Sequence, residues 1–155
     1  YTATQSLTDA PTKGKDFRRG RAAAVNIVPS TTGAAVSVTR AIPDLANRFD
    51  GIAIRVPVVT GSLIDLTCVT KRPTAKEEIT ALFQKAAQST RWGGTLGVTT
   101  DQPVSGDIVG LPRAVIVDIE YTKVVDGDLV KVLAWYDNEW GYVTTLVQHV
   151  LALKS

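Results

Sequence analysis

The feature of this sequence that most limits its fold is a set of strand-like segments separated by short turn sequences. Residues 51–59 read Gly-Ile-Ala-Ile-Arg-Val-Pro-Val-Val, an apolar and β-branched composition typical of a strand. Residues 63–71 alternate apolar and polar side chains as a second strand would, and Gly61-Ser62 supplies a turn between the two runs. The pattern predicts a β-hairpin.

A second hairpin is predicted nearer the C-terminus. Residues 114–119 and 129–136 are apolar and β-branched, and Asp126-Gly127 between them is typical of tight turns in antiparallel hairpins. Residues 92–112 are instead rich in Gly, Thr, Pro and Asp, so we expect a loop with one short strand there.

Helical patterns separate and follow these strands. Thr74 with Glu77 three residues later fits a capping box, and the apolar stripe behind it predicts a helix over 75–89. A shorter helix is expected at about 33–48. The tail should end in an amphipathic helix, whose apolar face consists of Val143, Leu146, Val147, Val150 and Leu151. Hairpins combined with helices predict an α+β fold, a mostly antiparallel sheet with helices packed on one face.

Composition narrows the classes of function. The chain has 155 residues, the size of one ordinary domain, and 45% of them are hydrophobic, which is enough for a packed core. The formal net charge of +2 is too small to favour a specific nucleic acid as partner. No apolar run reaches the ~18 residues of a membrane span, so a membrane partner is not expected.

Other classes of site are also disfavoured. The single cysteine excludes an internal disulfide and fits a cytoplasmic setting. The sequence has no metal-ligand cluster and no glycine-rich dinucleotide-binding turn. It contains no Met, so we expect a truncated or processed piece of a longer chain.

Candidate anion ligands lie in the N-terminal third. Arg55 interrupts an apolar strand, where its guanidinium needs either a phosphate or carboxylate ligand or an ion pair with a protein carboxylate. Thr32-Gly33 opens a predicted helix, which could bind an anion or simply cap the helix. Arg19 and Arg21 could flank one anion or belong to a solvated basic loop.

Three features nearer the C-terminus are weaker. The run from Asp137 to Tyr142 lies between a strand and the last helix, where it could bind a ligand or form a capping turn. His149 flanks the apolar stripe of the last helix and is expected at the surface. Cys68 lies within a strand and is expected to be a buried packing residue.

Four segments carry more information together than apart. They are Tyr1-Thr2-Ala3-Thr4-Gln5, the stretch from Arg21 to Ala35 that contains Pro29-Ser30-Thr31-Thr32-Gly33, Ile54-Arg55-Val56-Pro57, and Trp135-Tyr136-Asp137-Asn138-Glu139-Trp140-Gly141-Tyr142. In this order and spacing they resemble the catalytic domain of the phosphorylating glyceraldehyde-3-phosphate dehydrogenases, over nearly the whole chain. That family works in glycolysis as a homotetramer.

The resemblance implies an NAD-dependent oxidoreductase. The family oxidises glyceraldehyde 3-phosphate with NAD and inorganic phosphate to 1,3-bisphosphoglycerate, by way of a cysteine thiolate that a histidine activates. By position, Thr2 and Arg55 match the residues that hold the phosphate of the substrate. Thr4 lies beside them.

The resemblance also implies a second phosphate site and a cofactor contact. Thr32 and Gly33 match the site for the attacking inorganic phosphate, with Arg19 nearby. Asn138 matches the residue that hydrogen-bonds the nicotinamide amide, and Tyr142 matches the aromatic residue near it.

Departures from the family pattern bear on activity. The nucleophile of the family lies in a Ser-Cys-Thr-Thr-Asn-Cys motif that does not occur here, and its histidine belongs in a His-Ala pair directly before Tyr1. Cys68 and His149 match neither residue. We therefore expect residues 1–155 to form a partial catalytic domain with no catalytic residue and no metal, inactive alone, and NAD to be bound mainly by a nucleotide-binding domain outside this sequence.

Local differences and two alternatives stay open. Lys13-Gly14-Lys15 resembles a small insertion, and Val58-Val59-Thr60-Gly61 replaces the usual turn after Arg55. The chain could instead be a non-catalytic anion-binding or assembly module with the same fold. It could also be a relative of the erythrose-4-phosphate dehydrogenases, and the choice between NAD and NADP is left open.

Overall fold

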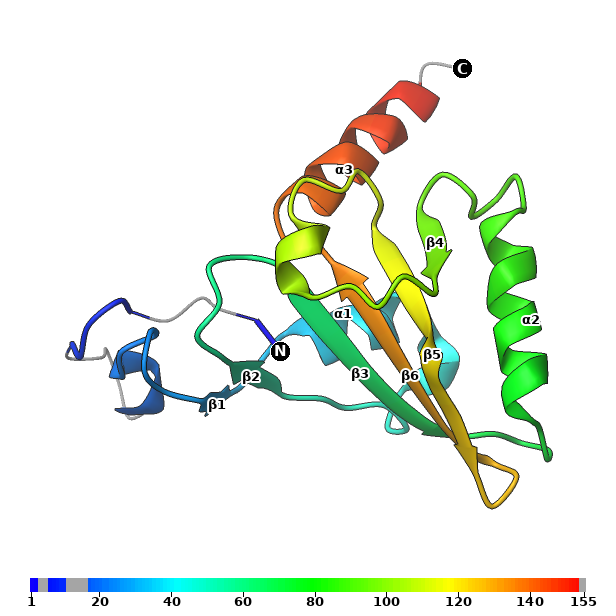
Figure 1. Cartoon of the computed structure of the whole chain (residues 1–155), viewed down its shortest axis with the longest axis horizontal. Helices are drawn as coiled ribbons and strands as arrows, with labels where there is room; N and C mark the ends of the chain where they lie inside the picture. Colours follow the sequence, from blue (N-terminus) through cyan, green and yellow to red (C-terminus); the bar gives the residue numbers. More distant parts are fainter. Residues whose placement is uncertain (3–5, 11–16, 154–155) are drawn as a thin grey trace. The chain divides into compact units, whose positions relative to one another are not determined.

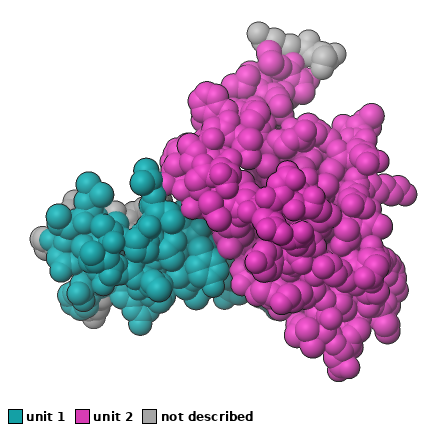
Figure 2. Space-filling model, in the orientation of Figure 1, with its two compact units in different colours: residues 1–59 teal, residues 60–155 magenta. Residues whose placement is uncertain are grey.

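A computed structural model of the chain describes residues 1–2, 6–10 and 17–153, and it divides the chain into two compact units. The first unit spans Tyr1–Val59 and the second Thr60–Ser155, as coloured in Figure 2. Among the described residues, no helix is long and apolar enough to cross a membrane.

The first unit is built around two short strands. The chain forms a 3₁₀ turn η1 (Phe17–Gly20), strand β1 (Val28–Ser30), helix α1 (Ala34–Ala41), a second 3₁₀ turn η2 (Pro43–Leu45) and strand β2 (Ala53–Arg55). β1 and β2 pair antiparallel, with Val28 opposite Arg55 and Ser30 opposite Ala53. Thr2 adds a parallel bridge to Arg55 on the other side of β2.

The helix expected at about 33–48 ends earlier, at Ala41. Ile42 takes an extended conformation, with φ −128° and ψ 84°, and the chain then enters η2 at Pro43. A residue before proline is pushed out of the helical region by the proline ring, and proline has no N–H to continue the helical hydrogen bonds. The predicted length was therefore wrong.

The second unit is an α+β arrangement, as the sequence predicts. It contains β3 (Ser62–Val69), α2 (Lys76–Ala87), β4 (Leu96–Thr99), a 3₁₀ turn η3 (Ser105–Ile108), β5 (Val115–Val125), β6 (Leu129–Tyr136) and α3 (Trp140–Ala152) (Figure 1). The four strands form one sheet in the order β3-β6-β5-β4. Pairing is antiparallel except between β4 and β5, which are parallel.

The hairpin predicted between 51–59 and 63–71 does not form. β2 pairs with β1, whereas β3 pairs over its whole length with β6, from Ser62 opposite Tyr136 to Val69 opposite Leu129. An eight-residue partner satisfies the backbone of β3 and extends its apolar face, which a three-residue strand cannot do.

The second predicted hairpin, between β5 and β6, is confirmed. Its turn residues Asp126 and Gly127 both have positive φ, 50° and 78°. The two residues lie at the centre of a turn closed by a hydrogen bond from Asp128 N to Val125 O at 3.3 Å, and their positive φ gives the backbone twist that a tight hairpin turn needs.

The core of the second unit lies on one face of its sheet. The buried residues are Val117, Ile119, Val130, Val132 and Ala134. Helix α2, drawn in green beside β4 and β5 in Figure 1, packs against this face through Ile79 and Phe83. The predicted apolar stripe of α2 therefore covers the sheet. Helix α3 is also confirmed, although its predicted apolar face is exposed among the described residues.

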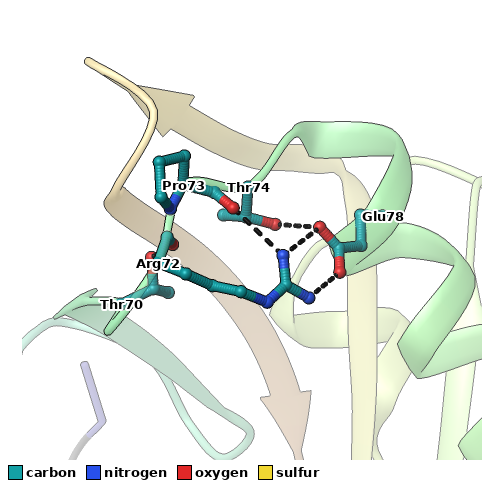
Figure 3. Close-up of polar contacts among 5 residues, drawn as sticks. All are labelled: Thr70, Arg72, Pro73, Thr74 and Glu78. Carbon is teal, nitrogen blue, oxygen red and sulfur yellow. Dashed lines mark hydrogen bonds and ion pairs between the residues drawn. The ribbon is translucent and has the colours of Figure 1, made fainter.

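The start of α2 differs from the predicted capping box. The helix begins at Lys76, so Glu78 rather than Glu77 is its third residue. Glu78 forms a two-pronged ion pair with Arg72 and accepts a hydrogen bond from the Thr74 hydroxyl at 2.8 Å (Figure 3). The N-cap Ala75 makes no side-chain cap hydrogen bond, and the Glu78 carboxylate is instead bound by the guanidinium fork of Arg72.

Candidate functional site

Arg55 lies at the end of β2, between β1 and the Thr2 segment. Backbone hydrogen bonds run from Thr2 N to Ile54 O at 3.0 Å and from Val56 N to Thr2 O at 2.9 Å. Thr2 is buried, with 9% of its surface exposed. The structure thus places Thr2 and Arg55, both predicted as ligands of the substrate phosphate, side by side through an isolated parallel bridge.

The Arg55 side chain is held by a neutral partner. Its Nε donates to the Ser30 hydroxyl at 3.1 Å, and the residue is half-buried. Among the described residues Arg55 forms no ion pair, which was the alternative left open for it. Because no carboxylate pairs with it, this half-buried guanidinium is suited to bind an anionic ligand.

Arg19 reaches the segment that follows β1. Its Nη2 donates to the Thr31 carbonyl at 3.0 Å and to the Thr31 hydroxyl at 3.2 Å. Thr31 directly precedes Thr32 and Gly33, so the three residues predicted around inorganic phosphate meet at the start of α1. Gly33 is the N-cap of α1, and space for a Cβ there is open.

Thr32 also takes part in local capping. Its hydroxyl accepts a hydrogen bond from Ala34 N at 3.2 Å. Such a bond satisfies one backbone donor of the first turn, as the capping interpretation expects. Remaining donors of that turn, the helix dipole and the nearby Arg19 all favour an anion.

Two expected features lie outside the described residues. Thr4, predicted beside the substrate phosphate, is one of them, and the Lys13-Gly14-Lys15 segment is the other. Arg21, the other basic residue considered, forms an ion pair with Asp9 at 3.3 Å on the surface. Arg19 and Arg21 therefore have different partners in this structure.

The predicted cofactor residues belong to the second unit. Asn138 lies between the end of β6 and the start of α3, and Tyr142 follows one helical turn later with 67% of its surface exposed. The carboxamide oxygen of Asn138 accepts from the hydroxyls of Ser62 at 3.3 Å and Thr60 at 3.4 Å. Its nitrogen donates to Glu139 Oε1 at 3.2 Å.

Asp137 fixes the backbone on either side of Asn138. This buried carboxylate accepts hydrogen bonds at 2.8 Å from the backbone amides of Gly110, Glu139 and Trp140. Burial by itself raises the pKa of Asp137, but the three backbone donors together hold it below its usual range. The carboxylate caps α3 and ties a distant loop to it.

Sequence reasoning did not single out Ser30, Thr60, Ser62 or Asp137 as individual site residues. In the sequence, Ser30 belongs to one of the four segments that resemble the family, and Thr60 belongs to the turn after Arg55 that differs from it. The signal that could have found them is the register: Ser62 pairs with Tyr136, which brings Thr60 near Asn138.

An apolar groove of the second unit is lined by none of the predicted site residues. It has a volume of about 430 Å³ and lies between α2 and the sheet, with Leu66, Cys68, Ile79, Phe83 and Trp92 among its lining residues.

The prediction that Cys68 is buried was wrong, because β3 is an edge strand and the thiol is exposed. His149 is exposed, as expected. The described residues contain no group of acidic, His or Cys side chains suited to a metal.

Comparison with known proteins identifies a family. The sequence profile described as "Glyceraldehyde 3-phosphate dehydrogenase, C-terminal domain" matches residues 1–138. Glyceraldehyde-3-phosphate dehydrogenase 2 of Streptomyces avermitilis is 48% identical over 147 residues, covering 95% of this chain and 43% of the relative. The glyceraldehyde-3-phosphate dehydrogenase of Mycobacterium avium is 48% identical over 150 residues, covering 97% and 43%. Glyceraldehyde-3-phosphate dehydrogenase B of Aspergillus oryzae is 47% identical over 142 residues, covering 92% and 42%. The chain thus spans less than half the length of these relatives.

Proposed function

The chain belongs to the glyceraldehyde 3-phosphate dehydrogenase C-terminal domain family, and on that premise we propose that it is the phosphate-binding part of a glycolytic oxidoreductase. The reaction is oxidative phosphorylation of glyceraldehyde 3-phosphate to 1,3-bisphosphoglycerate. NAD accepts the hydride in this reaction. In this proposal the reaction takes place in the cytoplasm, and the assembled enzyme is a homotetramer, as in the family.

The half-buried guanidinium of Arg55 carries the proposal. Ser30 orients it, Thr2 forms an isolated bridge to the Arg55 backbone, and no carboxylate among the described residues neutralises it. A phosphate monoester supplies the charge and the oxygen acceptors that a guanidinium fork takes. In the proposed site Arg55 and Thr2 hold the phosphate of the substrate, with Thr4 as a further ligand.

Inorganic phosphate is assigned to the start of α1. Arg19 is held beside Thr31 by two hydrogen bonds, and Thr32 and Gly33 lead into the first turn of the helix. A helix N-terminus and a guanidinium both stabilise an anion, and together they do so better than either alone. In the proposed reaction this phosphate attacks the acyl group and releases it from the enzyme.

The nicotinamide contact is assigned to Asn138 and Tyr142. A carboxamide fixed by two hydroxyls can form a defined hydrogen bond with another amide, and an exposed aromatic ring one turn along the helix offers a surface for a flat ring. These residues fit a nicotinamide. Binding of the remainder of the cofactor is assigned to a nucleotide-binding domain outside this sequence.

The 155-residue chain by itself is proposed to be inactive. Covalent catalysis needs a cysteine thiolate activated by a base, and neither Cys68 on β3 nor His149 on α3 matches the family residues for these roles. Positioned phosphates without a nucleophile give binding but no turnover.

The test compares this chain with the full-length product of its gene. Reading the coding sequence upstream of Tyr1 should reveal a His-Ala pair, a Ser-Cys-Thr-Thr-Asn-Cys motif and a nucleotide-binding domain. The full-length product should then form NADH from glyceraldehyde 3-phosphate, NAD and phosphate, whereas the 155-residue chain should not. A start codon close to Tyr1, or turnover by the short chain, would overturn the proposal. The first of these outcomes would favour the non-catalytic module, and faster turnover of erythrose 4-phosphate would favour that other enzyme class.

A further inference from the structure

We propose that the hydroxyls of Thr60 and Ser62 act as a positioning pair that fixes the carboxamide of Asn138. The inference rests on the proposed function for its catalytic meaning, because Asn138 is the assigned nicotinamide contact. Its structural content, a carboxamide held by two hydroxyls, stands on contacts within the second unit alone.

The antiparallel register of β3 and β6 brings the three residues together. Ser62, the first residue of β3, pairs with Tyr136, the last residue of β6. Thr60 therefore lies two residues before this pair and Asn138 two residues after it. The two hydroxyls reach the Asn138 Oδ1 atom at 3.4 Å and 3.3 Å, although they are 78 and 76 residues away in the sequence.

The turn that carries the hydroxyls is itself held in place. Ser62 is 1% exposed, and Gly61 has a φ of +83°. A Cβ added at Gly61 would come within 2.6 Å of the Ser105 carbonyl oxygen, so the backbone of this turn lies directly against η3. Thr60 and Ser62 thus present their hydroxyls from a packed segment and not from a free loop.

The backbone of Asn138 is fixed from its other side. Asp137 accepts hydrogen bonds from the amides of Gly110, Glu139 and Trp140, which anchors the chain on both sides of Asn138. The remaining freedom is in the side chain, because the last torsion of asparagine is broad and roughly two-fold. A carboxamide oxygen has two lone pairs, and two hydroxyls can occupy both of them.

This arrangement gives the turn after Arg55 a role. Thr60 supplies one of the two hydroxyls, and Gly61 brings the backbone of the same turn against Ser105. In this chain, that turn orients the residue assigned to the cofactor.

The test uses the full-length product of the gene and two isosteric or truncating changes, Thr60→Val and Ser62→Ala, alone and together. Each lost hydroxyl should raise KM for NAD about 2- to 10-fold, with a smaller change in kcat. Thr60→Ser keeps a hydroxyl and should restore a KM close to the unmodified value. Thr67→Val, an exposed position on the same strand, serves as the matched control and should change neither constant.

A second readout separates this inference from the proposed function. In protein labelled with ¹⁵N-asparagine, the side-chain signal of Asn138 is identified by its loss in Asn138→Ala. The double variant should broaden or shift that signal, which Thr67→Val should leave unchanged. An unaltered Asn138 signal in the double variant would overturn the positioning pair. An altered signal with an unchanged KM for NAD would support the pair and refute the assignment of Asn138 to the nicotinamide.

Discussion

Arg55 of β2 reaches diagonally across to Ser30 of β1, with Arg55 Nε 3.1 Å from the Ser30 hydroxyl. The next residue along the chain, Thr31, accepts two hydrogen bonds from Arg19. Ser30, the last residue of β1, and Thr31, which follows it, therefore orient two different arginines. We infer that the two proposed phosphate sites share this short segment as a common support.

Replacing Ser30 should weaken binding of the aldehyde substrate. In the full-length gene product, Ser30→Ala removes the acceptor that orients Arg55 and should raise KM for glyceraldehyde 3-phosphate about 2- to 10-fold. The measurement is initial rate against aldehyde concentration at saturating NAD and phosphate. Thr39→Val, which removes a hydroxyl that donates to the Val36 carbonyl within α1, is the control. Equal KM values for Ser30→Ala and the control would argue against an orienting role.

Arg19 should affect the other phosphate. Arg19→Ala removes the cation beside the start of α1, so KM for inorganic phosphate should rise by about 10-fold or more, while KM for the aldehyde changes less. Initial rates at varied concentrations of phosphate and of the aldehyde measure the two KM values. Arg40→Ala, at the exposed C-terminal end of the same helix, is the matched control for loss of charge. If the aldehyde KM responds more strongly than the phosphate KM, the two sites have been assigned the wrong way round.

The sequence predicted those parts of the fold that depend on local chemistry. The turn at Asp126-Gly127, the apolar stripe of α2 and the helix α3 follow from turn geometry and periodicity, and all are present. The partner of β3 could not be predicted in this way, because the choice of partner depends on how well the side chains of two strands distant in the sequence pack together. Cys68 shows the same limit, since alternation gives the face of a strand but not whether that strand lies at an edge.

For the candidate site, the sequence indicated the residues with unusual charge or position. Arg55 was found because a cation in an apolar strand needs an explanation, and Thr32-Gly33 because a helix begins there. Ser30 and Thr60 are ordinary polar residues whose partners lie 25 and 78 positions away. Only the register of the strands shows that they contact the predicted residues.

Gly61 is expected to be intolerant of a side chain for two reasons that can be separated. Gly61 has a φ of +83°, which is unfavourable for alanine, and the Cβ that Gly61→Ala adds would also lie 2.6 Å from the Ser105 carbonyl oxygen. Gly110→Ala introduces a similar φ, 81°, with no atom within 4 Å of the new Cβ. We expect the free energy of unfolding to fall by about 1 kcal/mol for Gly110→Ala and by about 2–4 kcal/mol for Gly61→Ala. Urea denaturation of both variants measures the difference, and equal losses would mean that the close approach to Ser105 is relieved without cost.

The ion pair at the start of α2 should make stability depend on acid pH. The Arg72 guanidinium, followed by the Thr74 hydroxyl, lowers the pKa of Glu78 from its ordinary value of 4.5 to about 2. A carboxyl group whose pKa is lower in the folded state stabilises the fold above the unfolded-state pKa, and that contribution is lost as the pH falls towards the folded-state pKa. The contribution should therefore be complete above about pH 4.5, should shrink as the pH falls below that value, and should be lost as the pH falls through about 2.

Glu78→Gln tests this pH window. The variant should be less stable than the unmodified chain at neutral pH, and the two should converge as the pH falls through about 2, because protonation of Glu78 then removes the same charge. The pair is exposed, so we expect a small difference at neutral pH that added salt reduces further. Glu77→Gln, one residue earlier in the first turn of α2, controls for the general loss of an acidic side chain near a helix N-terminus. Thermal unfolding of the three proteins between pH 2 and 7 would contradict the ion-pair explanation if Glu77→Gln and Glu78→Gln behaved alike across the whole range.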